Sequence, residues 1–175
     1  MTKFLIYIKH NAVFVWDIIE KINGYIFRLL FYKKILRSLD FLLKNTKMEK
    51  YDFKIMKRND LPTLQNFLKS QKKEQMSYFQ PHNSDSKTLL RLYNNSSFFM
   101  LGVFDKGNST LVGYFFLRFF FNKKGFIGRI VDPEFQRQGI AKQMSNILYG
   151  VIWANNFRCL STISKNNKAI FNLHE

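Results

Sequence analysis

The feature that most constrains the fold is a strand joined by a short polar turn to one long amphipathic helix. Residues 125–131 are typical of a strand, and Pro133 ends it. Apolar residues then recur at i, i+4, i+7, i+8, i+11 and i+12: Ile140, Met144, Ile147, Leu148, Val151 and Ile152. This spacing puts them on one face of a four-turn helix. The polar turn therefore lies at the amino end of a helix whose other side packs on the rest of the domain.

The chain from Tyr51 onward has the pattern of a mixed α/β domain. Further strands are expected at residues 51–56, 97–104, 111–121 and 157–164, and helices at about 60–71, 84–93 and 166–175. Residues 105–108 (Asp-Lys-Gly-Asn) favour a hairpin turn. The apolar run from Phe115 to Phe121 suits a central strand covered on both faces. We predict an α/β fold with a mainly antiparallel central sheet flanked by helices.

Residues 1–48 form a different region, which we predict to be a basic, amphipathic helical extension. Apolar residues recur there at steps of four and three: Ile18, Ile22, Tyr25, Leu29, Tyr32, Leu36, Leu39 and Leu43. Lysines and arginines lie between them, and Asn23-Gly24 is the expected break. One hypothesis is a helix lying in the interface of an anionic membrane. The alternative is a helical hairpin packed on the main domain or on a second subunit.

Composition narrows the classes of function. The 175 residues suit one domain with an appendage, and Cys159, the single cysteine, allows no internal disulfide. No Cys/His spacing suggests a zinc site, so no metal is predicted and a cytoplasmic location is expected. The net charge of +16 would attract anionic partners. The longest stretch without charge, residues 143–157, is too short and polar to span a bilayer, and no secretory signal is recognised.

The turn after the strand at residues 125–131 has the chemistry of an anion-binding site. The first amides of a helix have no partner within the helix, and the helix dipole favours negative charge there. Gly139 leaves room for a phosphate at the backbone, and Arg137 and Lys142 add positive charge. The alternative is that Gly139 merely permits a tight connection between strand and helix.

The order of elements and this turn resemble the Gcn5-related N-acetyltransferase (GNAT) superfamily. Residues 136–141 (Gln-Arg-Gln-Gly-Ile-Ala) match the family's Q/R-x-x-G-x-G/A acyl-CoA signature, and residues 131–135 match the V-x-P-x-x run before it. Residues 111–114 look like the family's central strand, and residues 167–175 are similar to its later helix. The resemblance covers about residues 51–175 and implies a GNAT-like domain that lacks the family's C-terminal strands.

The resemblance implies acetyl-CoA as co-substrate. It places the pyrophosphate on backbone amides from Gln138 to Lys142 and the pantetheine arm along Ile130 and Val131. The residues that it assigns to acetyl-CoA are Ile130, Val131, Gln136, Arg137, Gln138, Gly139, Ile140, Ala141, Lys142 and Asn167. An amine would then attack the thioester directly, so Cys159 needs no catalytic role and is expected to be an inert core residue.

The catalytic groups are less well defined by the resemblance. Relatives often carry a base glutamate on the strand before the signature, where this chain has Phe126-Ile127-Gly128-Arg129 and no carboxylate. His174 stands where relatives have the tyrosine that protonates the thiolate, and it is a candidate acid. His82 is the candidate base. It ends a Tyr-Phe-Gln-Pro-His stretch, residues 78–82, that resembles a stretch in family members of bacterial surface-glycan pathways. Tyr78 and Arg129 are predicted to contact the acceptor. A solvated or purely structural histidine is the alternative for both positions.

The sequence thus predicts an acetyl-CoA-dependent N-acetyltransferase that acts on a small amine, with an amino sugar of surface-glycan synthesis as the suggested acceptor. Its N-terminal extension suggests peripheral attachment to the inner face of a membrane, and homo-oligomers are allowed. The rival hypothesis is a non-catalytic binding protein that uses the same turn or its basic surface. Nucleic acid is not favoured as a partner, because the aromatic residues do not alternate with Lys and Arg in an RNA-binding motif.

Overall fold

The computed structural model describes residues 13–73, 76, 79, 81–161. They form one five-stranded sheet in the order β1-β2-β3-β4-β5. The strands are β1 (Tyr51–Ile55), β2 (Phe98–Asp105), β3 (Leu111–Phe120), β4 (Lys124–Val131) and β5 (Arg158–Leu160). Neighbouring strands are antiparallel except β4 and β5, which are parallel. The predicted mixed α/β fold with a mainly antiparallel sheet is confirmed.

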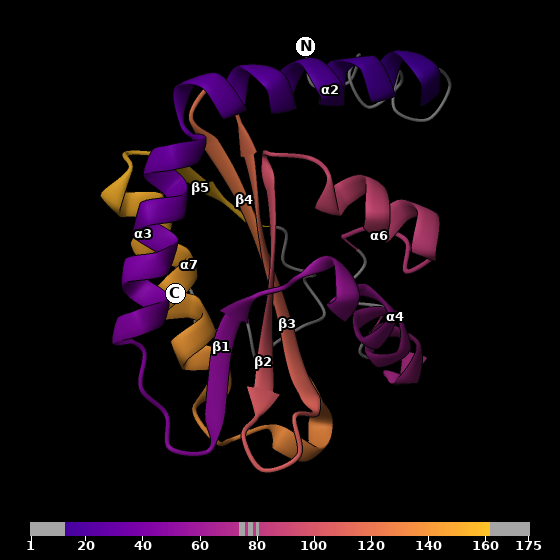
Figure 1. Ribbon diagram of the computed structural model, residues 1–175, viewed down its shortest axis with the longest axis vertical. Coiled ribbons are helices and arrows are strands. Elements are labelled where there is room, and N and C mark those ends of the chain that lie inside the picture. The colour runs from indigo at the N-terminus through magenta and orange to yellow at the C-terminus, as the bar shows by residue number, and fades with distance from the viewer. Residues whose placement is uncertain (1–12, 74–75, 77–78, 80, 162–175) are drawn as a thin grey trace.

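Helices cover both faces of the sheet (Figure 1). One face is covered by α3 (Tyr32–Asn45) and α7 (Ile140–Ala154), and the other by α4 (Leu61–Ser70) and α6 (Ser86–Tyr93). The helix α2 (Val13–Leu30) lies across one end of the sheet, next to the turn that joins β3 to β4. Two short 3-10 helices, η1 (Arg58–Asp60) and η2 (Pro133–Phe135), precede α4 and α7. The structure thus has three layers, with α2 across one end.

The Phe-rich strand β3 lies in the middle of the sheet, as its unbroken apolar run predicts. Eight of its ten residues are buried, because helices cover the sheet on both sides. The predicted apolar face of α7 is also confirmed, since its buried residues are those that the spacing picks out: Ile140, Met144, Ile147, Leu148, Val151 and Ile152. The register between β3 and β4 runs without a bulge from Gly113 opposite Val131 to Phe120 opposite Lys124.

Boundaries differ from the predicted ones by a few residues. The helix α6 begins at Ser86, two residues after the expected start, and is capped by Asp85, whose carboxylate accepts a hydrogen bond from the Thr88 amide at 2.9 Å. The strand expected from residue 157 is described over Arg158–Leu160. Its predicted continuation to 164 and the helix expected at 166–175 lie outside the described residues.

The N-terminal helices break at Phe31 and not at Asn23-Gly24, so the predicted position of the break is wrong. Asn23 stays helical because its side chain bonds outside the helix, to Ser97, Phe119 and the Phe121 amide. A Cβ on Gly24 would lie 2.7 Å from Asn95 Oδ1, so this glycine allows close packing inside a continuous helix. Phe31 departs from helical geometry with φ −129° and ψ −23°, and the chain changes direction there.

Both N-terminal helices contribute to the hydrophobic core. Phe27 of α2 and Ile35 and Leu39 of α3 are fully buried in the cluster that also holds the inner face of α7. This packing is the one expected for a helical hairpin on the main domain. The division of the chain into a separate unit over residues 1–48 stays a prediction. In the described part of the chain, no helix is both long enough and apolar enough to cross a membrane.

Candidate functional site

The turn between β4 and α7 is held in place at its start by Asp132. The Asp132 amide donates to the Val112 carbonyl at 2.9 Å, which continues the β3–β4 pairing. Its carboxylate accepts from the Glu134 amide at 3.0 Å, and Pro133 then starts the short helix η2. The chain therefore leaves the sheet at a defined angle, and residues 136–139 form the exposed part of the turn.

Two residues of this turn have left-handed backbones. Arg137 has φ 60° and Gly139 has φ 79°. A Cβ on Gly139 would meet nothing closer than Met48 Cε at 3.9 Å, so the positive φ, and not crowding, is the reason for glycine here. Ser109, Lys123 and Asn156, in other turns, also have positive φ, so the backbone of Arg137 alone does not mark a functional turn. Alternating left-handed and right-handed residues aim successive amides at one point, where an anion can bind.

The first turn of α7 adds further amide donors. The Gln143 amide donates to the Gly139 carbonyl at 3.1 Å, which makes it the first bonded amide of the helix. The amides of Ile140, Ala141 and Lys142 come before it and have no helical partner, and Gly139 supplies no side-chain cap. The small, exposed Ala141 leaves these amides open to solvent. The open space, the free amides and the helix dipole fit a pyrophosphate.

Side chains of the turn fix it to the sheet. The Gln138 side chain accepts a hydrogen bond from the Tyr51 hydroxyl of β1, and Gln136 Nε2 donates to the Val131 carbonyl at 3.5 Å. Arg137 and Lys142 are exposed beside the amides. The predicted phosphate-binding residues are therefore contiguous and stand at one end of β4. Tyr51 was not predicted as part of this site, because the contact joins residues 87 positions apart.

The strand β4 has a free edge over half its length. Its partner β5 pairs only with Lys124, Gly125 and Phe126, and no described strand pairs with residues 127–131 on that side. In an antiparallel pair, the amide and carbonyl of alternate residues point to the partner strand. Because the Asp132 amide bonds to β3, Ile130 also points its backbone to β3, whereas Val131 and Arg129 point theirs to the free edge.

Arg129 lies on the α7 side of the sheet. Burial raises the pKa of the Tyr149 phenol on α7, and the nearby Arg129 guanidinium opposes this rise in pKa. Ile127 and Val131, two positions away from Arg129 on either side, share its face of the strand and lie in the core cluster beneath α7. Ile130, on the opposite face, lies in the cluster beneath α4 and α6. Arg129, a predicted acceptor contact, and His82, the predicted base, therefore lie on opposite faces of the sheet.

His82 lies in an aromatic pocket on the α4–α6 face. Its ring meets the rings of Phe98, Tyr114 and Phe116 edge to face, with centroids 5.8–6.2 Å apart. Its Nδ1 is 2.9 Å from the Asn83 carbonyl oxygen and its Nε2 is 3.0 Å from the Tyr114 hydroxyl. A carbonyl oxygen can only accept, so we assign the proton to Nδ1, and Nε2 accepts from Tyr114.

Burial disfavours the charged forms of both His82 and Tyr114. Burial lowers the pKa of His82 below its usual 6.5, the Asn83 carbonyl partly opposes this, and Arg118 lowers the pKa further. Burial also raises the pKa of the fully buried Tyr114 far above its usual value. Both side chains are therefore neutral near pH 7. The role of Tyr114 was not predicted, although a single hydroxyl in a phenylalanine-rich strand was a usable signal.

Three predicted site residues, Tyr78, Asn167 and His174, lie outside the described residues. Cys159 is half-buried, and burial raises the pKa of its thiol, in keeping with the inert role that was expected. Within the described ranges, no group of three or more His, Cys, Asp or Glu residues is placed to hold a metal ion.

Comparisons with known proteins agree on one family. The model of the acetyltransferase (GNAT) family matches residues 65–175. Many solved structures are similar in fold. A ribosomal-protein-S5-alanine acetyltransferase from Vibrio fischeri is 18% identical with a TM-score of 0.60, over 73% of this chain and 78% of its own.

Two further structures show the same likeness. A predicted acetyltransferase from Clostridium acetobutylicum with acetyl-CoA is 17% identical, with a TM-score of 0.56 over 71% of this chain and 88% of its own. An aminoglycoside acetyltransferase from an uncultured soil metagenomic sample is 18% identical, with a TM-score of 0.53 over 71% and 84%. At such identities the likeness concerns the fold. A search of curated proteins found no match.

Proposed function

Since the chain belongs to the acetyltransferase (GNAT) family, we propose that it transfers an acetyl group from acetyl-CoA to a primary amine. The observation that carries this proposal is the turn at residues 136–139, where two left-handed residues lead into the free amides of α7 beside the free edge of β4. These features suit the two parts of the co-substrate, its pyrophosphate and its extended pantetheine arm.

For the co-substrate, we propose that the amides from Gln138 to Lys142 hold the pyrophosphate, with Arg137 and the side chain of Gln136 at the rim. The backbone groups of Val131 and Arg129 would bond the pantetheine arm, because they face the free edge. The contact with the pantetheine arm that was predicted for Ile130 would then be made by Val131 and Arg129. When bound, the thioester supplies an acetyl carbonyl that an amine can attack. Asn167 and His174 keep their predicted roles as proposals.

For the base, we propose His82. An amine attacks only when neutral, so the site needs a group that takes its proton near pH 7. The lowered pKa keeps His82 unprotonated and ready to accept. The lone pair lies on Nε2, and because Tyr114 is fully buried, the amine would deliver its proton to Nε2 directly, in place of the Tyr114 hydrogen bond. His82 stands in for the glutamate that β4 lacks.

The acceptor that we propose is an amino sugar. Two considerations support it: the Tyr-Phe-Gln-Pro-His stretch at residues 78–82, and the presence of an aminoglycoside acetyltransferase among proteins of similar fold. Tyr78 remains the proposed acceptor contact. We do not extend this role to the Arg129 side chain, which lies beside Tyr149 on the other face of the sheet.

The proposal is tested first by isothermal titration of the full chain with acetyl-CoA, CoA and dephospho-CoA. Saturable binding of acetyl-CoA is expected. In a second titration, Gly139→Glu is compared with Gly139→Ala. Both variants suffer the same backbone strain at φ 79°, but only glutamate adds bulk and negative charge to the turn. We expect a loss of affinity of at least about 100-fold for glutamate and a much smaller one for alanine. Equal affinities in the two variants would refute the assignment of the turn.

A kinetic test addresses His82. The variant His82→Gln should lower kcat by about 100-fold or more and leave the affinity for acetyl-CoA unchanged, because general-base catalysis contributes on that scale. Tyr114→Phe should lower kcat and shift its pH profile, which a purely structural role would not do. Tight acetyl-CoA binding with no transfer to any amine in a screen would favour the rival, a non-catalytic binding protein.

A further inference from the structure

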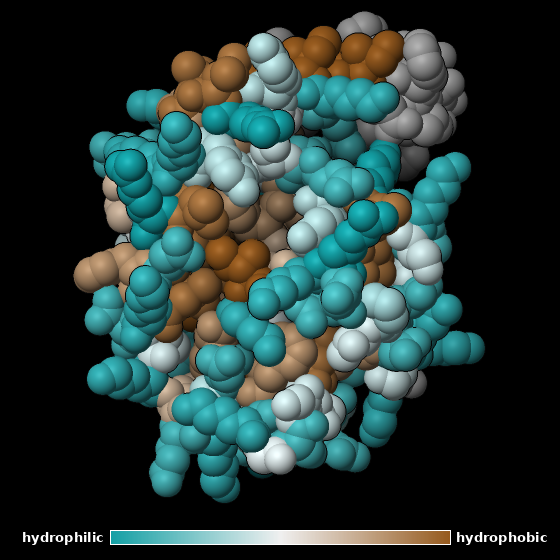
Figure 2. All heavy atoms as spheres, in the orientation of Figure 1, coloured by the Kyte–Doolittle hydropathy of each residue, from teal (hydrophilic) through white to brown (hydrophobic). Residues whose placement is uncertain are grey.

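The outward face of α2 carries an apolar stripe. We call Ile18, Ile22, Tyr25 and Leu29 the outer stripe; their exposed fractions are 40%, 53%, 67% and 67%. Steps of four, three and four residues put them in one line along the helix. Leu30, 63% exposed, lies at its end. Figure 2 shows this apolar surface along α2, at the top of the molecule.

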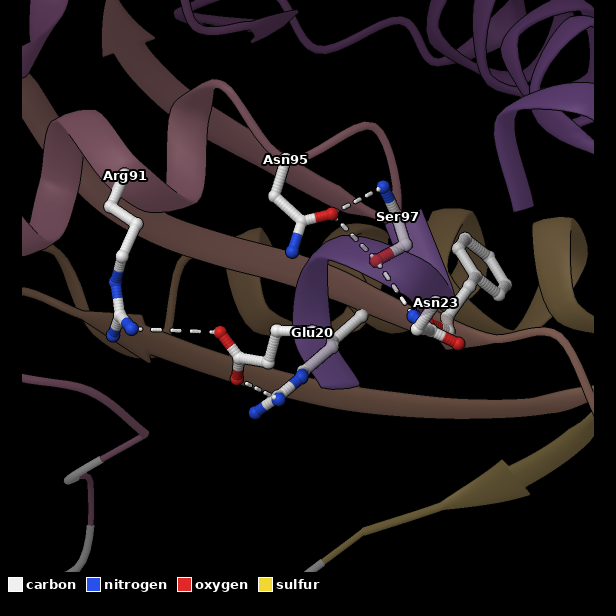
Figure 3. A network of polar contacts seen from close by, with 7 residues as sticks. Glu20, Asn23, Arg91, Asn95 and Ser97 are labelled. Carbon is white, nitrogen blue, oxygen red and sulfur yellow. Dashed lines mark hydrogen bonds and ion pairs between the residues drawn. The ribbon is translucent and has the colours of Figure 1, made fainter. Parts of the chain in front are cut away.

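The outer stripe cannot turn inward, because the opposite face of α2 is tied to the sheet (Figure 3). Asn23 donates to the Ser97 hydroxyl at 3.0 Å and to the Phe119 carbonyl at 2.9 Å, and its oxygen accepts from the Phe121 amide. Phe27 stacks on Phe119 with centroids 5.2 Å apart. These contacts fix the rotation of the helix about its axis.

The charged side chains that the structure describes on the outer side of α2 are basic. Lys21 and Arg28 are exposed and seven residues apart, so they lie along the same flank of the outer stripe. The acidic residue between them and the domain, Glu20, is turned inward and pairs with Arg118 at 2.5 Å and Arg91 at 3.7 Å. Glu20 therefore does not offset the outward positive charge.

The turn between β3 and β4 lies beside α2 and carries further exposed apolar and basic side chains. The Phe121 amide bonds to Asn23, which places the turn beside α2. The Phe121 side chain is 52% exposed, and Lys123 and Lys124 next to it are exposed as well. The end of the molecule thus presents apolar side chains with lysines and arginine around them.

We propose that the outer stripe and the Phe121 turn bind the interface of an anionic membrane, with the apolar side chains among the acyl chains and the basic ones at the headgroups. Amphipathic helices bind in this way when apolar burial and attraction to anionic lipid add together. Charge favours this occupant over a second copy of the chain, because each copy carries +16 and an antiparallel pairing of two outer stripes would bring their Lys21 and Arg28 flanks together.

The proposed orientation keeps the co-substrate turn in water. The strand β4 begins beside α2 and ends at Val131, where the turn at residues 136–139 starts α7 at the other end of the sheet (Figure 1). A membrane under α2 would therefore leave the amides of α7 open to solvent. The inference does not depend on the proposed acetyl transfer, and acetyl-CoA affinity reports on that function separately.

Flotation of the full chain with vesicles tests the proposal. Vesicles of phosphatidylcholine are compared with vesicles that also contain phosphatidylglycerol. The stripe variant is Ile22→Ser with Leu29→Ser. The matched control is Phe41→Ser with Trp153→Ser, which removes apolar side chains of similar exposure, 66% and 67%, from other surfaces. We expect binding that requires phosphatidylglycerol, falls at least about tenfold in the stripe variant and persists in the control variant.

Each other outcome overturns the proposal. Equal flotation of the stripe variant and the wild type would show that another surface binds or that the stripe is covered. No flotation of the wild type would show that the chain does not bind these vesicles. Sedimentation equilibrium tests the remaining alternative, a second copy of the chain. If the wild type is a dimer that does not bind vesicles, and the stripe variant is a monomer, the outer stripe is a dimer interface. Acetyl-CoA affinity should be equal in all variants.

Discussion

The helices α2 and α3 carry one continuous apolar repeat but use it in opposite directions. In α3 the repeat faces the core: Leu39 is fully buried, and Tyr32, Leu36 and Leu43 pack against the same cluster. In α2 the same repeat faces solvent, and its residues are 40–67% exposed. The periodicity of apolar residues identifies a face of a helix, but it does not say which side of the helix the protein covers.

The cause of the reversal lies in the one residue between the helices and in the residues opposite the stripe. Phe31 changes the direction of the chain, so the line of the repeat points to a different side after it. Among the side chains of α2 that the structure describes, the buried positions are Asn23, Gly24 and Phe27, and only the phenylalanine is apolar. Hydrogen bonds and close backbone packing replace part of the hydrophobic contact there.

The largest contrast is expected from truncating the repeat on each helix. Leu39→Ala should lower the free energy of unfolding by about 3 kcal/mol, because it leaves a cavity in the core. Leu29→Ala removes a side chain that is 67% exposed and should cost less than about 0.5 kcal/mol. Urea denaturation of both variants measures the difference. Similar losses would mean that the outer stripe is covered within the folded chain.

Local patterns in the sequence predicted most of the sheet and all of the apolar face of α7. These predictions succeed because the apolar residues of these elements face the core, so the spacing of apolar residues matches the pattern of burial. The turn at residues 136–139 was predicted as well, because Gly139 and the signature around it act through the backbone of a short segment. Local features of this kind can be read without knowing the tertiary contacts.

Contacts between distant segments could not be predicted in this way. The Tyr114 hydroxyl meets His82 across 32 residues, and the Asn23 side chain reaches Phe119 across 96. The predicted position of the helix break was wrong for the same reason. Asn23-Gly24 has the composition typical of a break, but the two residues make tertiary contacts inside a continuous helix. Polar residues at inward positions are set by the partner that they meet, which the local sequence does not show.

The second contrast concerns the polar inner face of α2. Asn23→Ala removes three hydrogen bonds and leaves the Phe119 carbonyl and the Ser97 hydroxyl without this partner, so we expect a loss of about 2 kcal/mol in unfolding free energy. Asn45→Ala in α3 removes one exposed bond, from Asn45 Nδ2 to the Phe41 carbonyl, and should cost less than about 0.5 kcal/mol. A small effect at Asn23 would show that its hydrogen bonds contribute little to holding α2 on the sheet.

A third, smaller effect is expected at Gly24. By helix propensity alone, Gly24→Ala would stabilise α2 by about 1 kcal/mol. The new Cβ would stand 2.7 Å from Asn95 Oδ1, which is itself held by the Ser97 amide and hydroxyl. We therefore expect a net loss of about 1 kcal/mol. In a double-mutant cycle with Asn95→Ala, the two losses should be less than additive, because the second change removes the clash. Stabilisation by the single variant would contradict close packing at this point.

The smallest effect connects α2 to the proposed base. Because burial lowers the pKa of His82 in the folded protein, its neutral form contributes stability that is complete above pH 6.5 and is lost as the pH falls through the lowered value. Arg118 adds to this depression, and Glu20 of α2 pairs with Arg118.

Glu20→Gln should therefore lower the pKa of His82 further, since the charge of Arg118 is no longer offset. Arg118→Met should raise it. Titration of the His82 ring protons by NMR, with wild-type chain as reference, measures both shifts. Opposite signs in the two variants would link the orientation of α2 to the protonation of His82, whereas an unchanged pKa in Glu20→Gln would show that the helix and the histidine are electrostatically independent.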